Sequence, residues 1–326
     1  MKKVLVFFFT LYISGPVILF LFPWILGHAI FAHWYSAPFG VDLSRPNDVL
    51  NHTVNFYLNT EKDISVGVWH TLPSSQWEAA RGRTSPEWYR AALIDARPVI
   101  IFLHGNGGTR AAKHRVGLVK NLSAAGFHVF SLDYRGFGDS SGDPTEEGVT
   151  KDALYLYHWV KQHSRGNQIC LWGQSLGTGV ATNAAVRLQK QGFAVDAVIL
   201  QAAYTRIREV VAMDTLAKPY IFLPGFKNLI WTIMEKIKVE FANDKNLQTL
   251  TSPLLLLHAK DDTVVPYYMA QELYDISVRT HRHINREDEV ELVSFSEDLG
   301  YNHSDLYLNP HLTNIITNFL EKLKRW

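Results

Sequence analysis

One serine in the chain has the surroundings of a nucleophile. Residues 171–179 read LWGQSLGTG, so Ser175 stands between Gly173 and Gly177, directly after an apolar run and directly before a helical pattern. A serine in such a tight turn projects its hydroxyl, and small residues two positions away avoid clashes. The amide of Leu176, at the helix start, could donate to an oxyanion. This pattern indicates acyl transfer through a covalent serine intermediate.

The same Gly-x-Ser-x-Gly pattern recurs at residues 138–142, which read GDSSG. It lies several residues past the preceding apolar run, in a stretch rich in Gly, Asp, Ser and Pro, and no helical pattern follows at once. We expect a surface loop there. The strand–turn–helix setting therefore selects Ser175 as the nucleophile.

A serine nucleophile needs a base, and the base needs an acid that orients it. The run PLLLLH at 253–258 is followed by AKDDTVVP, where a D-x-x-V-P turn favours Asp262 over Asp261. Asp261 could hold the loop through backbone bonds. The run VELVSF at 290–295 is followed by DLGYNHSD, in which His303 fits the base. The order Ser, Asp, His is that of alpha/beta hydrolases.

A glycine-rich loop follows another apolar run. Residues 104–108 read HGNGG after PVIIFL, and we expect the amide of Asn106 to be a second oxyanion donor. A phosphate-binding loop is the alternative, but no Gly-Lys-Ser/Thr follows and no third glycine is in register. The chain has no His-Glu-x-x-His motif and no Cys/His set with zinc spacing. The sequence therefore predicts neither a metal nor a cofactor.

Alternating strands and helices must position these residues. Apolar strand patterns are followed or separated by helical patterns at 114–125, 145–163, 176–189, 267–278 and 312–323. The strand patterns occupy 51–58, 64–70, 98–104, 127–133, 168–173, 195–201, 253–258 and 290–295. This alternation predicts an α/β fold, a mostly parallel sheet with helices on both faces. The alternation stops at about 204–250, which we interpret as a helical cap insertion; ordinary helices packed on the core are the alternative.

The N-terminal segment is strongly apolar. No Asp, Glu, Lys or Arg occurs from residue 4 to 41, and residues 4–26 are long enough for one transmembrane helix. Lys2 and Lys3 precede this run, so the positive-inside rule places the N-terminus in the cytosol and the remaining chain in the lumen or outside. A signal peptide cleaved near residues 27–29 and a buried core helix are the alternatives.

Composition narrows the class of protein further. Among 326 residues, 32 basic and 31 acidic side chains give a net charge of +1, so no global field favours nucleic acid. The single cysteine, Cys170, excludes an intramolecular disulfide. We divide the chain into an anchor and stalk, 1–45, and a catalytic domain, 46–326. Asn51 is the favoured glycosylation site, whereas a glycan on Asn302 would obstruct the neighbouring base.

Several motifs together resemble one known family. HGNGGTR with HRV, DYRGFGDS, WGQSLGTGVATN, LLLLHAKDDTVVP and DLGYNH are similar, in this order, to the membrane-anchored alpha/beta-hydrolase-domain twelve family. The resemblance implies an alpha/beta-hydrolase fold and a triad of Ser175, Asp262 and His303. It further implies a lipid substrate, lysophosphatidylserine or a monoacylglycerol, and an endoplasmic reticulum membrane protein with a lumenal catalytic domain. The plasma membrane is the alternative location.

The predicted function is therefore hydrolysis of an acyl ester by a membrane-anchored serine hydrolase. Arg110 and Arg115, which follow the oxyanion loop, could attract an anionic phosphoserine head group, or they could be solvated helix charges. A thioesterase or peptidase of the same fold, acting on non-lipid substrates, is an alternative. The other alternative is a catalytically silent binding protein, against which the complete Ser, Asp, His order argues.

Overall fold

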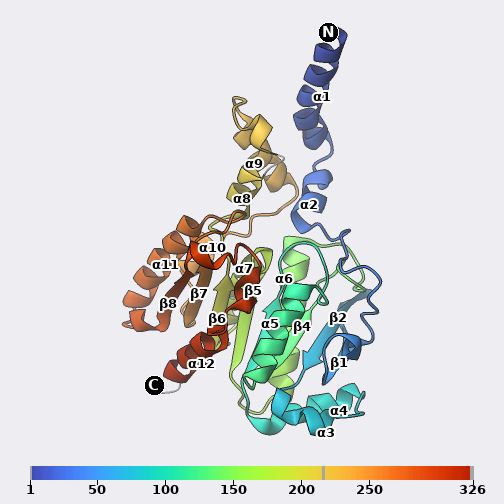
Figure 1. The fold of residues 1–326 in the computed structure, drawn as a ribbon. Coiled ribbons are helices and arrows are strands. Elements are labelled where there is room, and N and C mark those ends of the chain that lie inside the picture. The colour runs from blue at the N-terminus through green and yellow to red at the C-terminus, as the bar shows by residue number, and fades with distance from the viewer. Residues whose placement is uncertain (1, 215–216, 324–326) are drawn as a thin grey trace.

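A central sheet carries the structure (Figure 1). The computed structural model describes residues 2–214 and 217–323, and within them eight strands form one sheet in the order β1-β2-β4-β3-β5-β6-β7-β8. The strands are β1 (Thr53–Glu61), β2 (Ile64–Thr71), β3 (Val99–Leu103), β4 (His128–Leu132), β5 (Ile169–Gln174), β6 (Ala197–Gln201), β7 (Leu254–Ala259) and β8 (Val290–Phe295).

The sheet is mostly parallel, as predicted. Two pairings are antiparallel: that of β1 with β2 and that of β2 with β4. The other pairings, along β4, β3, β5, β6, β7 and β8, are parallel. Every residue of β3, β5, β6 and β7 is buried, which explains why these strands are continuous apolar runs in the sequence. Their carboxyl ends meet at one edge of the sheet, where open sheets of this kind place ligands.

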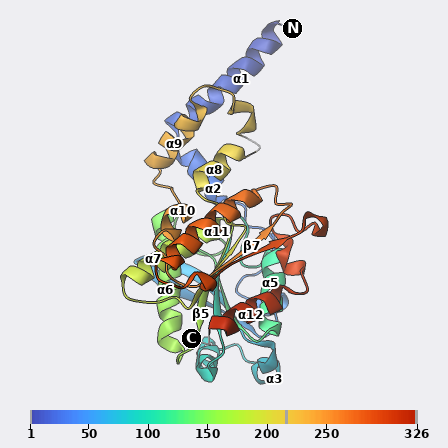
Figure 2. The same cartoon turned by 90° about the vertical axis from the view of Figure 1, so that its left-hand side faces the viewer.

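Helices cover both faces of the sheet, which Figure 1 and Figure 2 show from two directions. Side chains alternate along β3: Val99, Ile101 and Leu103 pack on one face, and Ile100 and Phe102 on the other. The first face is covered by α6 (Glu146–His163), α7 (Leu176–Lys190) and α11 (Tyr267–Arg282). The second is covered by α5 (Lys113–Ala124) and α12 (Leu312–Leu323), while α3 (Trp77–Ala80) and α4 (Pro86–Ala91) lie at the end remote from the N-terminus.

The long connection between β6 and β7 contains the helices of the predicted cap. Helices α8 (Ile207–Met213) and α9 (Phe226–Lys236) stand beyond the sheet, beside the N-terminal helices (Figures 1 and 2). The third helix, α10 (Asn243–Leu247), packs on α7 instead, where the Asn243 amide oxygen accepts a 2.7 Å hydrogen bond from Thr182. The insertion therefore has a projecting part and a part that belongs to the core.

The N-terminal segment is not one continuous helix over residues 4–26. Helix α1 (Lys2–Leu21) includes Pro16, and the chain then breaks at Pro23 before α2 (Trp24–Phe31). Among the residues described, no single helix is long and apolar enough to cross a membrane. By length and composition alone, the pair Tyr12–Leu21 and Trp24–Phe31 could do so, but its two parts are bent by 97°.

The break at Pro23 has a physical cause. Proline lacks an amide hydrogen, and its ring clashes with the preceding turn inside a helix. After the break, Leu26, Ile30 and Phe31 of α2 are buried against the rest of the protein. Their packing explains why α2 leaves the direction of α1 and lies over the sheet.

Candidate active site

Ser175 occupies a sharp turn between β5 and α7. Its backbone has φ 51° and ψ −119°, a conformation that L-residues rarely adopt. The turn is possible because its glycines leave room: a Cβ on Gly173 would overlap the carbonyl of Gly177, and a Cβ on Gly177 would overlap the carbonyl of Leu103. The hydroxyl is thereby raised above the carboxyl end of the sheet.

The structure brings Ser175, Asp262 and His303 together from three strand ends. His303 Nε2 lies 2.8 Å from Ser175 Oγ, and His303 Nδ1 lies 2.8 Å from Asp262 Oδ2. Because the carboxylate can only accept, Nδ1 carries the imidazole proton and Nε2 is free to accept the serine hydroxyl proton. This is the arrangement in which a histidine activates a serine for attack on an acyl carbon.

The two adjacent aspartates have different contacts. Asp262 Oδ1 accepts from the amides of Val264 and Val265, at 2.8 and 2.9 Å, while its other oxygen accepts from His303. Burial alone would raise the pKa of Asp262, but its interaction with His303 and the two backbone hydrogen bonds hold it below its usual value. Asp261 accepts from the backbone amide of Asn302 at 2.9 Å. It thus holds the loop that carries the imidazole.

The amides of Asn106 and Leu176 flank the nucleophile. Both residues line the same cavity as Ser175, and neither backbone N–H has a hydrogen-bond partner among the described residues. A Cβ on Gly105 would lie only 3.2 Å from Ser175 Cβ, so the glycine lets the loop approach the serine closely. Two unpaired donors beside the attacking oxygen are suited to a tetrahedral oxyanion.

Arg115 supports the oxyanion loop from beneath and was not predicted in this role. Its guanidinium donates to the carbonyls of Gly107 at 2.7 Å, Thr109 at 3.0 Å and Gly105 at 3.3 Å. Burial lowers the pKa of Arg115 to about 10, so the group is still charged at neutral pH. With these carbonyls turned toward Arg115, the intervening amide of Asn106 remains available to the cavity.

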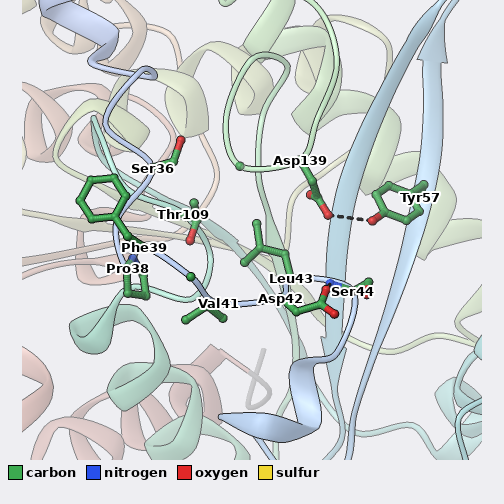
Figure 3. Close-up of a pocket in the computed structure, with 12 residues that line it drawn as sticks. Ser36, Pro38, Phe39, Val41, Asp42, Leu43, Ser44, Tyr57, Thr109 and Asp139 are labelled. Atoms are coloured by element: carbon green, nitrogen blue, oxygen red, sulfur yellow. Dashed lines mark hydrogen bonds between the residues drawn. The ribbon is translucent and has the colours of Figure 1, made fainter.

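The prediction that Arg110 and Arg115 bind an anionic head group is wrong. Arg110 is 1% exposed and Arg115 2%, so neither guanidinium reaches solvent. Arg110 forms ion pairs of 2.7 Å with Asp133 and with Asp139, and the latter also accepts from the Tyr57 hydroxyl at 2.7 Å (Figure 3). The charge of Arg110 is therefore neutralised inside the protein.

Figure 3 also shows where the chain goes after α2. Residues 36–44 border a groove of about 470 Å³ whose other side includes Tyr57, Thr109 and Asp139, and none of the triad residues lines it. The segment predicted as a stalk therefore lies against the catalytic domain. The groove itself is separate from the nucleophile.

The second Gly-x-Ser-x-Gly sequence is a loop bonded to β2 and to the residue that follows β4. Ser140 donates to the carbonyl of Asp133 at 2.7 Å and accepts from the amide of Gly67 at 2.9 Å. Its hydroxyl thus joins two backbone segments, and this accounts for the serine without catalysis. Of the sequon residues, Asn51 is exposed in a turn before β1, and Asn302 accepts from Thr263 beside the imidazole.

An apolar cavity of about 380 Å³ opens over the nucleophile. Ser175, Leu176 and Asn106 form its base. Cap residues form one side and N-terminal residues the other; a contribution from the N-terminal residues was not predicted. The cap contributes Tyr204, Ile207, Val210, Val211, Asp214, Ala217, Tyr220, Phe226 and Ile230, and the N-terminal helices contribute Leu19, Ile25, Leu26, Ala29 and Ile30.

The fold and the site define a serine hydrolase of the alpha/beta hydrolase class. A family model described as the alpha/beta hydrolase fold matches residues 98–226. Esterase Pf2001 from Pyrococcus furiosus superposes with a TM-score of 0.60 at 19% identity, covering 85% of this chain and 92% of that one, which supports the fold.

Two curated relatives are much more similar in sequence. Lysophosphatidylserine lipase ABHD12 of Danio rerio is 42% identical over 324 residues, which are 98% of this chain and 83% of that protein. Protein ABHD12B of Homo sapiens is 46% identical over 293 residues, 90% of this chain and 79% of that protein. The chain belongs to the ABHD12 family of serine ester hydrolases, which confirms the resemblance.

Proposed function

We propose that this protein is a lipase that hydrolyses the acyl ester of lysophosphatidylserine, and also that of monoacylglycerols. The observation that carries the proposal is the contact of Ser175 with His303 at the base of an apolar cavity. The printed name of the Danio rerio relative supports lysophosphatidylserine as the substrate. The apolar lining suits a fatty acyl chain, because burying methylene groups is favourable.

The reaction follows from the contacts of the triad. His303 Nε2 takes the hydroxyl proton as Ser175 Oγ attacks the ester carbonyl, and Asp262 stabilises the imidazolium that forms. The amides of Asn106 and Leu176 donate to the tetrahedral oxyanion. As the acyl–oxygen bond breaks, His303 returns the proton to the departing glycerol oxygen. Water then attacks the acyl-serine by the same route, releasing the fatty acid and restoring Ser175.

A fluorophosphonate probe and a lipid assay test this proposal together. The probe is expected to label the wild type and not Ser175→Ala, and the variant is expected to release fatty acid from lysophosphatidylserine at least about 10³-fold more slowly. Thioesters and peptides serve as comparison substrates. If a thioester or a peptide were hydrolysed faster than both lysophosphatidylserine and a monoacylglycerol, the proposed lipase function would be rejected. It would also be rejected if Ser175→Ala retained hydrolysis.

We further propose that the N-terminal helices anchor the protein in the endoplasmic reticulum membrane, with the catalytic domain in the lumen. Residues 4–41 carry no Asp, Glu, Lys or Arg, and Lys2 and Lys3 precede them, which favours a cytosolic N-terminus. Apolar side chains are exposed on α1 and at the cap tip, where Phe222 is 89% exposed. Exposed apolar groups gathered in this way are typical of membrane contact.

A further inference from the structure

We propose that α2 is one wall of the acyl-binding site, and that Leu26 and Ile30 give the enzyme its preference for long acyl chains. The inference rests on the proposed function and goes beyond it, because it assigns substrate selection to a segment otherwise read as an anchor. Both side chains are buried and both line the cavity above Ser175. An acyl chain extending from the serine would run between them and the cap.

The two sides of the cavity are built from segments far apart in the sequence. Facing α2 are the apolar side chains of Ile207, Phe226 and Ile230 from α8 and α9. Figures 1 and 2 both show these helices beside the N-terminal pair. With α2 absent, the cap would cover the nucleophile from one side only, so the N-terminal segment is needed to enclose a chain.

Helix α2 is held at a fixed position relative to the nucleophile. The chain leaving it forms three backbone hydrogen bonds with the oxyanion loop: Gly107 donates to Phe31 at 3.0 Å, Gly108 to Tyr35 at 2.6 Å, and Thr109 to Ala37 at 2.9 Å. These bonds involve the loop that also carries Asn106. The wall and the oxyanion donor are thus parts of one hydrogen-bonded unit, and a side chain on α2 has a defined distance from the reacting carbon.

The upper part of the cavity is closed by contacts between α1 and the cap. The rings of Tyr12 and Tyr220 stack at 4.7 Å, and the Tyr12 hydroxyl donates to the carbonyl of Pro219 at 2.6 Å. Gly15 permits this approach, since a Cβ there would lie 2.7 Å from the Tyr220 hydroxyl oxygen. Because Tyr220 also lines the cavity, the acyl site is enclosed at both α1 and α2.

The length of the acyl chain decides how much of this wall is used. A butyryl group attached to Ser175 would contact the base of the cavity, whereas a palmitoyl group would extend along α2. Each methylene buried in such a site changes affinity by about four-fold. A bulky side chain on α2 should therefore penalise long chains much more than short ones.

The test measures kcat/KM for p-nitrophenyl palmitate and p-nitrophenyl butyrate with the full-length protein in detergent. Leu26→Trp and Ile30→Trp are each expected to lower the palmitate-to-butyrate ratio by about ten-fold or more, because indole fills the channel. Leu26→Ala, which removes volume, should lower the ratio by several-fold through lost contacts. Trp24→Leu is the matched control, since Trp24 is on the same helix but 57% exposed.

The outcomes separate this inference from the proposed function. A ratio within two-fold of wild type for all three cavity variants, with butyrate still hydrolysed, would overturn the role of α2 and leave the lipase standing. A ratio that falls equally in Trp24→Leu would also overturn it. Failure of the wild type to hydrolyse either ester would count against the proposed function instead.

Discussion

At the scale of single residues, Ser175 combines strain with tight hydrogen bonding. A backbone in its conformation costs about 1–3 kcal/mol. The surroundings offset this cost: the Ser175 amide donates to the carbonyl of Gln201 at 2.9 Å, and the Thr178 amide donates to the Ser175 carbonyl at 2.8 Å. The strained turn is therefore fixed from β6 and α7, which keeps the hydroxyl within reach of His303.

The neighbouring pair Asp262 and Asp261 offers a sharp comparison. Asp262→Asn should lower kcat by about 10⁴-fold, because an amide can favour the wrong imidazole tautomer and carries no charge to stabilise the imidazolium. Asp261→Asn should change kcat by less than about ten-fold, since an amide oxygen can still accept from the Asn302 amide. Steady-state hydrolysis of a lysophospholipid by the two variants and wild type provides the measurement.

Equal losses in the two variants would mean that Asp262 is not the orienting acid. Fluorophosphonate labelling is a second readout of the same roles: labelling of Asp262→Asn should be slow, and that of Asp261→Asn close to wild type.

The triad could be predicted because each member follows an apolar strand, and strand ends meet at one edge. The burial of the Arg110 and Arg115 side chains could not be predicted. A cation after a glycine-rich loop has the same sequence pattern whether it faces solvent or turns inward. For Arg110 the outcome depends on Asp133 and Asp139, acceptors that lie 23 and 29 residues further along the chain and approach it only after folding.

At the scale of elements, the ion pairs and hydrogen bonds of Arg110 connect it to three segments. Its backbone and side chain both donate to Asp133, at the end of β4, at 2.7 Å each. Its side chain also reaches Asp139 in the 138–142 loop and Asn55 in β1. This group replaces the predicted head-group contact with a structural one, beneath the loop that presents the oxyanion donor.

The Asp133 pair predicts a pH-dependent contribution to stability. Burial alone would raise the pKa of the Asp133 carboxyl, but Arg110 and His104 hold it below its ordinary value of 3.8. Stability from a carboxylate with a depressed pKa is present above the unfolded pKa and is lost as pH falls through the folded pKa. Asp133→Asn should therefore lower the free energy of unfolding by about 3–5 kcal/mol at neutral pH.

Chemical denaturation of wild type and Asp133→Asn across pH measures this effect. The difference between them should narrow below about pH 4. The matched control is Asp48→Asn, which removes an exposed ion pair with Arg45 and should cost less than about 1 kcal/mol. A difference that is constant down to acid pH would contradict the assignment.

The regular elements were largely predictable from hydrophobic periodicity. The strand predicted at 98–104 is β3 (Val99–Leu103), and the helix predicted at 176–189 is α7 (Leu176–Lys190). The break between α1 and α2 was missed because an apolar run containing proline resembles a tolerated membrane kink. The direction of α2 is determined by the packing of Leu26 and Ile30 against helices distant in the sequence, which the local sequence does not indicate.

At the scale of the whole molecule, α1 extends away from the sheet and the N-terminus lies far from α3 and α4 (Figures 1 and 2). The exposed apolar side chains of this end, on α1, α2 and the cap, include Ile13, Val17, Ile18, Phe20, Leu21, Trp24 and Phe222. The catalytic cavity lies toward the same end, since α1, α2 and the cap line it. A membrane around α1 would therefore lie close to the site.

Asn51 reports the orientation of the whole chain. It is exposed, follows the N-terminal helices α1 and α2 in the chain, and belongs to an Asn-His-Thr sequon. With a lumenal catalytic domain, we expect Asn51 to carry a glycan, because transfer occurs in the lumen. Endoglycosidase treatment should then increase the gel mobility of the wild type and leave Asn51→Gln unshifted.

A matched control is Asn59→Gln, at an exposed asparagine of β1 outside any sequon, which should behave as wild type. Two results together would indicate a cytosolic catalytic domain. Endoglycosidase would leave the gel mobility of the wild type unchanged, and protease added outside intact microsomes would digest residues 46–326.

The three backbone hydrogen bonds between residues 31–37 and the oxyanion loop matter for anyone who purifies this enzyme. Truncating the chain at about residue 41, where charged residues begin again, is a usual route to a soluble sample. It would remove the carbonyls that accept hydrogen bonds from Gly107, Gly108 and Thr109, together with α2 as a wall of the acyl-binding site. We expect the shortened polypeptide to represent the active site poorly in crystallisation or inhibitor screening. For both purposes, the whole chain in nanodiscs is the appropriate sample.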